Sequence, residues 1–190
     1  MADVSGKGVP AALFMMATKN LIKSHALLGG TPAKVLAGVN GEICKNNADD
    51  MFVTVWFGIL TISTGDIIAC NAGHEYPVIK RRGGSFELIK EKHGMAIGVV
   101  DFATYTDYEL HLGAGDVLFL YTDGVPEATN QSQELFGVER MLAALNQMPD
   151  EAPEGILHNV YNSVGAFVGA ADQFDDLTML SIKMSEKNKE

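Results

Sequence analysis

The chain has 190 residues, a length typical of one domain, and 47% of them are apolar, which is enough for a substantial core and excludes a disordered chain. Its formal net charge of −10 argues against nucleic acid or an anionic membrane surface as a partner, because both attract basic proteins. The longest apolar run, residues 8–17, is too short for a bilayer, which requires about 20 residues.

Two helices are predicted at the start of the chain. The first begins near Val9 or Pro10 and ends before the glycines of LLGG, with Leu13 and Met16 among the residues of its apolar face. The second has Thr31 as its N-cap and extends over residues 32–47. Residues 51–63 are apolar on both alternating faces, which predicts a doubly buried strand, and residues 67–73 complete a hairpin with it.

Two further hairpins are predicted, at residues 76–89 and 104–124, each around a glycine-containing turn. Helical periodicity returns at residues 136–148 and 152–169, and residues 177–184 form a last strand. The segregation of strands and helices predicts an α+β fold, an α-β-β-α layered sandwich of antiparallel sheets. One domain should cover residues 1–184, followed by a disordered tail over residues 185–190.

Two cysteines, Cys44 and Cys70, lie outside any zinc-type spacing and are too few for a disulfide framework. We expect both to be buried thiols, because free cysteine behaves as a small core hydrophobe. Together with the absence of a basic, apolar leader pattern at the start of the sequence, this predicts a cytoplasmic location.

Acidic residues stand beside flexible backbone at three places. Asp3 precedes a glycine turn, Asp123 follows VLFLYT and precedes a glycine, and Asp175 and Asp176 precede the last strand. Carboxylate oxygens suit hard cations such as Mg²⁺ and Mn²⁺, and no His or Cys cluster favours a softer metal. The same pattern is also typical of ordinary turns and helix caps, so these residues alone leave both interpretations open.

Five stretches occur in an order that resembles a known family: ADVSGKGVPAALFMM, NAGHEYPVI, GDVLFLYTDGVPEATN, FGVERM and DQFDDLTMLSI. Together they resemble the bacterial metal-dependent serine/threonine phosphatases of protein phosphatase 2C (PP2C) type, in the subgroup of stage II sporulation protein E and the sigma-B regulatory phosphatases. The resemblance covers essentially the whole chain. It implies an α-β-β-α sandwich with a dinuclear Mn²⁺ or Mg²⁺ site.

The resemblance also implies roles for individual residues. Asp3 corresponds to the carboxylate that bridges both ions, and the carbonyl of Val4 to a ligand of one of them. Asp123 corresponds to a ligand of the other ion, and Asp175 to the last carboxylate ligand, with Asp176 as the alternative. The implied reaction is an in-line attack on phosphorus by a metal-activated water, without a covalent phosphoenzyme.

The same motifs contain further, weaker candidates for functional residues. Lys7 is a candidate contact for the substrate phosphate, and the alternative is a solvated turn lysine. His74, in NAGH, is either a proton donor or a structural turn residue. Gly6, Gly8 and Gly124 are expected to serve the backbone geometry beside the metals.

The family pattern has strands ahead of DVSGKG, and one of them carries a further metal-binding aspartate. This sequence begins two residues before Asp3, so an N-terminally truncated domain is expected, with a weakly held second ion and low activity. Sheet edges left open in this way would allow two copies to pair as a homodimer.

The sequence therefore predicts a phosphoprotein phosphatase that uses two Mn²⁺ or Mg²⁺ ions. Its expected substrate is phosphoserine or phosphothreonine on a regulatory protein, such as an anti-sigma-factor antagonist. The alternative is a catalytically weak or inactive fragment that binds a phosphoprotein as a signalling module. A metal nuclease conflicts with the net charge of −10.

Overall fold

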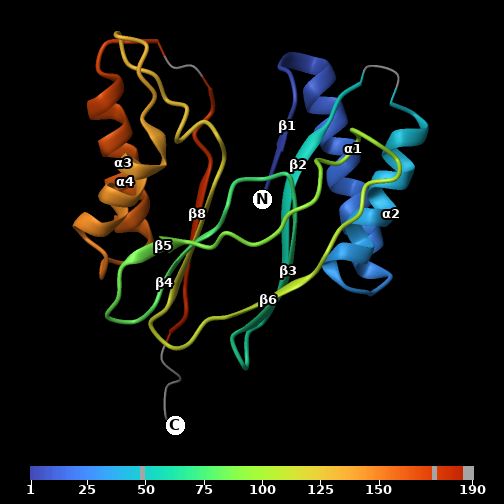
Figure 1. Cartoon of the computed structure of the whole chain (residues 1–190), viewed down its shortest axis with the longest axis horizontal. Helices are drawn as coiled ribbons and strands as arrows, with labels where there is room; N and C mark the ends of the chain where they lie inside the picture. The colour runs from blue at the N-terminus through green and yellow to red at the C-terminus, as the bar shows by residue number, and fades with distance from the viewer. Residues whose placement is uncertain (48–49, 173–174, 186–190) are drawn as a thin grey trace. The chain divides into compact units, whose positions relative to one another are not determined.

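A computed structural model describes residues 1–47, 50–172 and 175–185 (Figure 1). Its strands form two four-stranded antiparallel sheets, ordered β1-β2-β3-β6 and β5-β4-β7-β8. The elements are β1 (Ala2–Val4), α1 (Gly8–Leu27), α2 (Pro32–Lys45), β2 (Val53–Thr61), β3 (Asp66–Ala72), β4 (Val78–Lys80), β5 (Phe86–Leu88), β6 (Tyr108–His111), β7 (Val117–Tyr121), α3 (Gly137–Gln147), α4 (Pro153–Val168) and β8 (Met179–Lys183). The predicted α+β class with antiparallel sheets is confirmed.

The chain divides into two compact units. Unit 1 contains residues 1–74 and 91–111, and unit 2 contains residues 75–90 and the chain that follows His111. Unit 1 holds the sheet β1-β2-β3-β6 with α1 and α2, and unit 2 holds the sheet β5-β4-β7-β8 with α3 and α4.

In unit 1, the core forms where α2 packs on the sheet. Val35, Leu36 and Val39 of α2 are buried together with Val53 and Val55 of β2. Thr31 stands at the predicted N-cap and Pro32 in the first turn, as expected.

Helix α1 begins at the glycine turn and ends before Gly29, close to the predicted limits, but its predicted apolar face is wrong. Leu13 and Met16 are 55% and 56% exposed, whereas Ala11 and Thr18 are buried. Apolar residues occur on every side of this helix, so their period does not identify the side that packs.

In unit 2, β7 lies between β4 and β8, and all five of its residues are buried. Phe119 and Tyr121 of β7 pack with Met141 of α3 and with Ile156 and Val160 of α4. The doubly buried strand was predicted at residues 51–63 instead, and that prediction is wrong, because the second half of β2 is half-buried or exposed and Ile59 is 43% exposed.

Two predicted hairpins are confirmed. Strand β2 pairs with β3 from Val55↔Ala72 to Thr61↔Asp66, and β4 pairs with β5.

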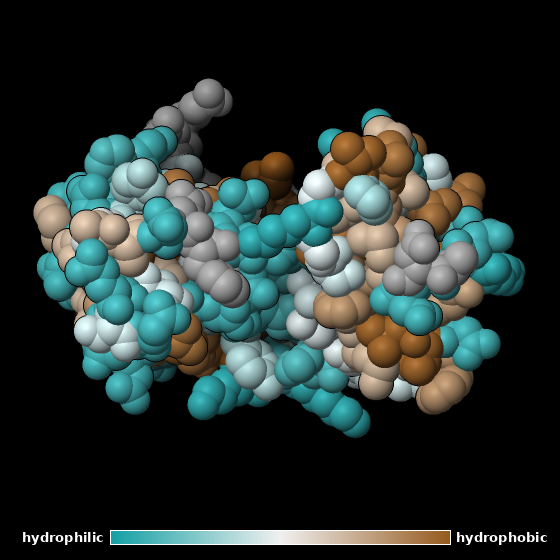
Figure 2. Space-filling model, turned by 90° about the horizontal axis from the view of Figure 1, so that it is seen from above, coloured by the Kyte–Doolittle hydropathy of each residue, from teal (hydrophilic) through white to brown (hydrophobic). Residues whose placement is uncertain are grey.

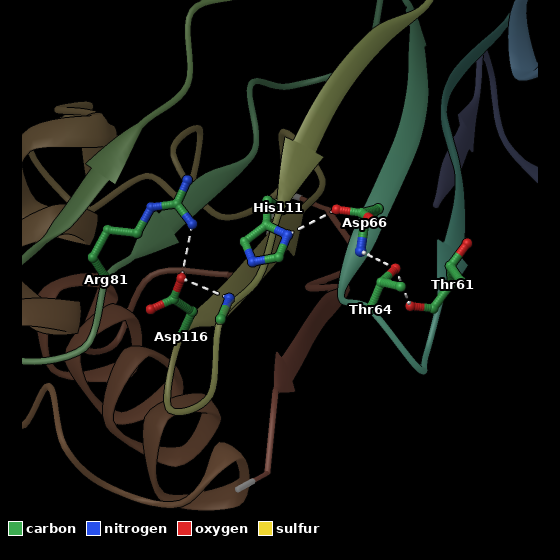
Figure 3. A network of polar contacts seen from close by, with 7 residues as sticks. Thr61, Thr64, Asp66, Arg81, His111 and Asp116 are labelled. Atoms are coloured by element: carbon green, nitrogen blue, oxygen red, sulfur yellow. Dashed lines mark hydrogen bonds and ion pairs between the residues drawn. The ribbon is translucent and has the colours of Figure 1, made fainter. Parts of the chain in front are cut away.

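The third predicted hairpin, at residues 104–124, is wrong. Strand β6 pairs with β3 in unit 1, and β7 pairs with β4 and β8 in unit 2. The side chain of Asp116 explains why the turn does not fold β7 back on β6. Its oxygens accept a hydrogen bond from the Arg81 guanidinium at 2.7 Å (Figure 3). They also accept hydrogen bonds from the backbone N–H groups of Arg82 and Gly113, at 2.8 and 3.0 Å. These bonds hold the start of β7 beside the end of β4.

The first residues form a strand that the sequence did not predict. Met1 donates from its amino group to the carbonyl of Trp56 at 2.9 Å, and β1 pairs with β2 as the edge of its sheet. Residue 185 is described as non-helical backbone, and residues 186–190 of the predicted tail lie outside the described residues. Homodimer formation through sheet edges stays a prediction.

Both cysteines are free, as predicted, and Cys70 is buried whereas Cys44 is half-buried. Burial raises the pKa of the Cys70 thiol to about 11, so it stays protonated at neutral pH. Within the described part of the chain, no helix is both long and apolar enough to cross a membrane. The cytoplasmic location stays a prediction.

Candidate functional site

Asp123 follows the last residues of the β7–β8 ladder in unit 2. The register pairs Tyr121 with Met179, and the N–H of Thr122 donates to the carbonyl of Thr178 at 3.1 Å. The backbone then turns, because the carbonyl of Asp123 accepts a hydrogen bond at 2.9 Å from the N–H four residues later. The half-buried Asp123 therefore lies just beyond the C-terminal end of β7, a strand that is fully buried.

Gly124 permits the second acidic segment to approach this turn. A Cβ atom at position 124 would collide with the carbonyl oxygen of Asp176 and would lie 3.7 Å from the Cβ of Asp175. The predicted role of Gly124 in backbone geometry is thus confirmed. The structure brings Asp123 and the pair Asp175–Asp176 together at one end of unit 2.

The two members of the acidic pair differ in exposure. Asp175 is half-buried and accepts a hydrogen bond from the N–H of Asp176 at 2.9 Å, whereas Asp176 is exposed. Both line a pocket of about 590 Å³ that also reaches Gly124. The partial burial of Asp175 favours it over Asp176 as the carboxylate that belongs to the site.

Asp3 lies on β1 in unit 1, opposite Thr54 of β2. Its Oδ1 accepts a hydrogen bond from the N–H of Val4 at 3.0 Å, so the carboxylate folds toward its own backbone.

The carbonyl of Val4 is directed away from the sheet. In an antiparallel pair, alternate residues point their backbone groups at the partner strand. Trp56 N donates to the carbonyl of Met1 at 2.9 Å, and Ser5 N donates to the carbonyl of Phe52 at 2.8 Å. The odd-numbered residues Met1 and Ser5 thus point their backbone groups at β2. Val4 has an even number, so its backbone groups point the other way, toward the open edge beside β1. This direction suits a carbonyl that binds a metal ion.

A contact that the sequence did not reveal supports Asp3. The Thr54 hydroxyl lies 3.4 Å from the carbonyl of Asp3 and 2.9 Å from Nδ1 of His74. His74 is itself held by Asn71, whose side chain bonds both the N–H and the carbonyl of His74, at 2.7 and 3.0 Å. These bonds favour the structural interpretation of His74. A weak signal existed, because Thr54 carries the one hydroxyl group in the stretch VTVWFGIL.

The glycine turn after Asp3 has the conformation that its glycines predict. Gly6 and Gly8 both have φ of +80°, in the left-handed region that other residues rarely adopt. Lys7 is exposed between them, at the N-cap of α1. Its contact with a substrate phosphate stays a prediction.

The donor set fits a hard divalent cation only in part. In unit 2, Asp123 and Asp175 lie on segments that approach each other at Gly124, and their carboxylates are of the kind that Mn²⁺ and Mg²⁺ prefer. Within residues 1–47, 50–172 and 175–185, no three His, Cys, Asp or Glu side chains gather closely enough to hold a metal ion. Asp3 belongs to unit 1, and a site that it shares with Asp123 and Asp175 stays a prediction.

Comparison with known proteins supports the resemblance. The family model described as stage II sporulation protein E (SpoIIE) matches residues 1–185. Protein IcfG of Synechocystis is 30% identical over 96% of this chain and 33% of its own length. Phosphoserine phosphatase RsbU of Bacillus subtilis is 28% identical over 86% of this chain and 49% of its own length. The chain thus spans about a third to a half of these relatives.

The fold also has solved counterparts. The SiaA-PP2C domain of Pseudomonas aeruginosa superposes with a TM-score of 0.83 at 22% identity, and covers 96% of this chain and 73% of that domain. A likeness at this identity establishes the fold. With the family model matched over residues 1–185, the chain belongs to the SpoIIE family of PP2C-type phosphatase domains.

Proposed function

We propose that this chain hydrolyses phosphoserine or phosphothreonine on a regulatory protein. The observation that carries the proposal is the approach of Asp175–Asp176 to the turn after Asp123, which only a glycine at position 124 allows. A turn that served merely to reverse the chain would not require carboxylates from two distant segments. The relative RsbU, a phosphoserine phosphatase, supports the choice of substrate group.

Four groups are proposed as ligands of two Mn²⁺ or Mg²⁺ ions: the carboxylates of Asp3, Asp123 and Asp175 and the carbonyl of Val4, with Asp176 as the alternative to Asp175. When bound, the ions would supply a water of lowered pKa and would offset charge on the phosphoryl oxygens. The chain's own contribution is to fix its carboxylates before the substrate arrives, so that no reorganisation is needed during the reaction.

Two further roles follow from position. Lys7 is proposed to attract the phosphate, because it is an exposed cationic residue at the N-cap of a 20-residue helix, and a helix N-terminus itself favours anions. Thr54 is proposed to hold the backbone of Asp3 through the hydrogen bond to its carbonyl.

The regulatory protein is proposed to act in a sigma-factor pathway, with an anti-sigma-factor antagonist as the example. The motifs resemble the subgroup of the sigma-B regulatory phosphatases, and this resemblance supports the assignment.

The test is phosphate release from a phosphoserine peptide with Mn²⁺ and with EDTA. Asp123→Asn should lower kcat/KM about a hundredfold or more, because even groups that only support a metal ligand contribute 10- to 100-fold. Glu127→Gln is the matched control, since Glu127 is exposed four residues further along and its side chain lies outside the proposed ligand set.

Two results would contradict the proposal: hydrolysis that persists in EDTA, or equal loss in Asp123→Asn and Glu127→Gln. Calorimetric titration with Mn²⁺ separates the alternative. Binding of the phosphopeptide without measurable binding of Mn²⁺ would favour a signalling module that lacks catalysis.

A further inference from the structure

A second pocket of unit 2 lies at the opposite end of the sheet from Asp123. Its volume is about 570 Å³, within the range of pockets that bind small ligands. Lys183, which lines it, pairs with Val117 at the start of β7. Tyr121 at the other end of β7 pairs with Met179, close to Asp123. Four residues of a strand span about 14 Å, so this pocket is separate from the candidate metal site.

Three cationic residues line this pocket: Lys80, Arg82 and Lys183. Lys80 of β4 and Lys183 of β8 both pair with Val117, so the two lysines lie in one row across the sheet. Paired residues direct their side chains to the same face, and neighbouring strands are about 4.8 Å apart. The backbones of the two lysines are therefore about 10 Å apart, and their side chains emerge on the same side.

Arg82 reaches the same end of the sheet. It follows Lys80 by two residues, and its side-chain carbons lie 3.3–3.5 Å from the position that a Cβ atom at Gly115 would take. Gly115 also lines the pocket, and its N–H donates to the carbonyl of Met184 at 2.8 Å. The turn before β7 thus lies between Arg82 and the end of β8.

The most deeply placed of these cations is Lys80. Its side chain is 3% exposed, and it is the one buried residue in the lining. Its Nζ donates to Oδ1 of Asp150 at 2.7 Å. Burial of an unpaired ammonium group would be costly, so Asp150 compensates the charge of Lys80.

Asp150 is the only carboxylate in the described lining, and it faces more than one cation. The hydrogen bond from Lys80 lowers the pKa of Asp150, and the charge of Lys183 lowers it further. Nζ of Lys183 donates to the carbonyls of Asp150 and Glu151, each at 3.2 Å. These acceptors are neutral, so they satisfy hydrogen bonds without cancelling the charge of Lys183.

Neighbouring carboxylates outside the lining are held elsewhere. Asp116 accepts a hydrogen bond from the Arg81 guanidinium at 2.7 Å. Oε2 of Glu151 lies 3.0 Å from the position that a Cβ atom at Gly155 of α4 would take. Among its lining residues, the pocket therefore keeps a surplus of two positive charges, in a chain whose net charge is −10.

We propose that this pocket, between the ends of β4 and β8 and the segment before α4, binds a multiply charged phosphate group. Cations that face one hollow from two strands suit a compact anion, and ammonium and guanidinium groups donate charge-assisted hydrogen bonds to phosphate oxygens. An extended acidic peptide would instead require cations along an open row. The phosphate can come from an inorganic phosphate chain or from a small organic molecule. This inference does not rest on the proposed function.

The test is isothermal titration calorimetry of the whole chain in EDTA, which removes divalent ions and so excludes binding through a metal. The titrants are inorganic phosphate, tripolyphosphate and ATP. We expect tripolyphosphate to bind more tightly than phosphate, because attraction to the pocket grows with charge. Tighter binding of ATP than of tripolyphosphate would identify an organic phosphate as the source. Equal or tighter binding of tripolyphosphate would identify an inorganic chain.

Variants separate this pocket from general attraction to lysines. Lys183→Met and Arg82→Met should each weaken the binding of tripolyphosphate about tenfold, because each removes charge-assisted hydrogen bonds. Lys90→Met is the matched control, since Lys90 is an exposed lysine of unit 2 outside the lining. Asp150→Asn should tighten binding, because it removes the negative charge of the lining. A purely structural role of these residues would not produce that gain.

Nitrogen-15 NMR locates the bound anion. Tripolyphosphate should shift the amide signals of Gly115 and Lys183 and leave that of Gly124 unchanged. Three results would overturn the proposal: no binding of any titrant by the folded wild-type chain, equal weakening in Lys183→Met and Lys90→Met, or shifts at Gly124 without shifts at Gly115. Binding of hexaglutamate without binding of tripolyphosphate would also overturn it, since the pocket would then serve an acidic protein segment.

Discussion

The two units hold their acidic residues in different ways. In unit 2, Asp123 follows a strand whose five residues are all buried and which has a strand on either side. In unit 1, Asp3 lies in the middle of a three-residue strand at a sheet edge. The backbone that carries Asp123 is therefore held by the core of unit 2, and the backbone that carries Asp3 is held by a few hydrogen bonds at a sheet edge.

The helices repeat this contrast. In unit 2, α4 buries Ile156, Val160 and Val164, whereas α1 of unit 1 leaves Val9 and Leu13 more than half exposed. Figure 2 shows hydrophobic atoms exposed over the helices of unit 1, and a mostly hydrophilic visible face on unit 2. A change near the site should thus affect stability in unit 2 and mainly activity in unit 1.

The largest expected effect tests whether both units serve one reaction. Asp3→Asn should lower kcat/KM for a phosphoserine peptide about a hundredfold or more, as should Asp123→Asn, because each removes a proposed metal ligand. Rates at saturating Mn²⁺ measure both variants side by side. If only Asp123→Asn loses activity, the reaction belongs to the carboxylates of unit 2, and the role proposed for Asp3 is wrong.

A second prediction concerns backbone contact. Gly124→Ala should lower the free energy of unfolding by about 1–3 kcal/mol, because its Cβ would collide with the carbonyl of Asp176 in a closely packed turn. The matched change in unit 1 is Gly41→Ala on α2, where a Cβ meets no atom within 4 Å. Gly41→Ala should raise stability by up to about 1 kcal/mol through helix propensity. Urea unfolding of both variants makes the comparison, and equal effects would show that the approach to Gly124 is not tight.

The elements that sequence patterns predicted well are those whose apolar residues follow one clear pattern or whose ends are marked by glycine. The doubly apolar stretch at residues 51–63 contains β2, and the glycines of LLGG follow the end of α1. The predicted hairpin at residues 104–124 failed because GAGD has the composition of a hairpin turn, whereas two of the three partners of Asp116 lie 34 and 35 residues earlier in the chain. A local pattern does not reveal a distant hydrogen-bond partner.

Those residues of the candidate site that belong to short sequence motifs could be predicted. Asp123 and Asp175 stood out as acidic residues beside flexible backbone, and the structure brings their segments together at Gly124. Thr54 and His74 did not stand out as a pair, because 20 residues separate them and only the β2–β3 hairpin joins them.

A third, smaller effect contrasts two acidic residues in Figure 3. Burial alone would raise the pKa of Asp116, but hydrogen bonds from the Arg81 guanidinium and two backbone N–H groups outweigh it and hold the pKa below its ordinary value. A carboxyl with a lowered pKa in the folded state adds stability above its unfolded pKa, and this contribution is lost as the pH falls through the folded value. Asp116→Asn should therefore cost about 1–2 kcal/mol at neutral pH, and the difference from wild type should shrink below about pH 4.

The control for Asp116 is Asp66→Asn in unit 1. Hydrogen bonds from Thr64 and His111 also lower the pKa of Asp66, but the side chains of Asp66 and His111 are both more than half exposed. Water and salt screen such a pair, so its loss should change stability less than the loss of Asp116. Thermal unfolding between pH 3 and pH 8 distinguishes the two. A larger loss of stability in Asp66→Asn than in Asp116→Asn would mean that the stronger electrostatic contacts lie in unit 1, not in unit 2.

The smallest effect is expected on the outer face of α1. Leu13→Ala removes a side chain that is 55% exposed, and alanine is at least as favourable in a helix, so the free energy of unfolding should change by no more than about 0.5 kcal/mol. Asn20→Ala, at another exposed position of the same helix, is the control. Urea unfolding measures both. A loss of about 2 kcal/mol or more in Leu13→Ala alone would mean that this face is packed in solution, because only a buried leucine costs that much when it is shortened. The contrast between the well-buried α4 of unit 2 and the largely exposed α1 of unit 1 would then have to be abandoned.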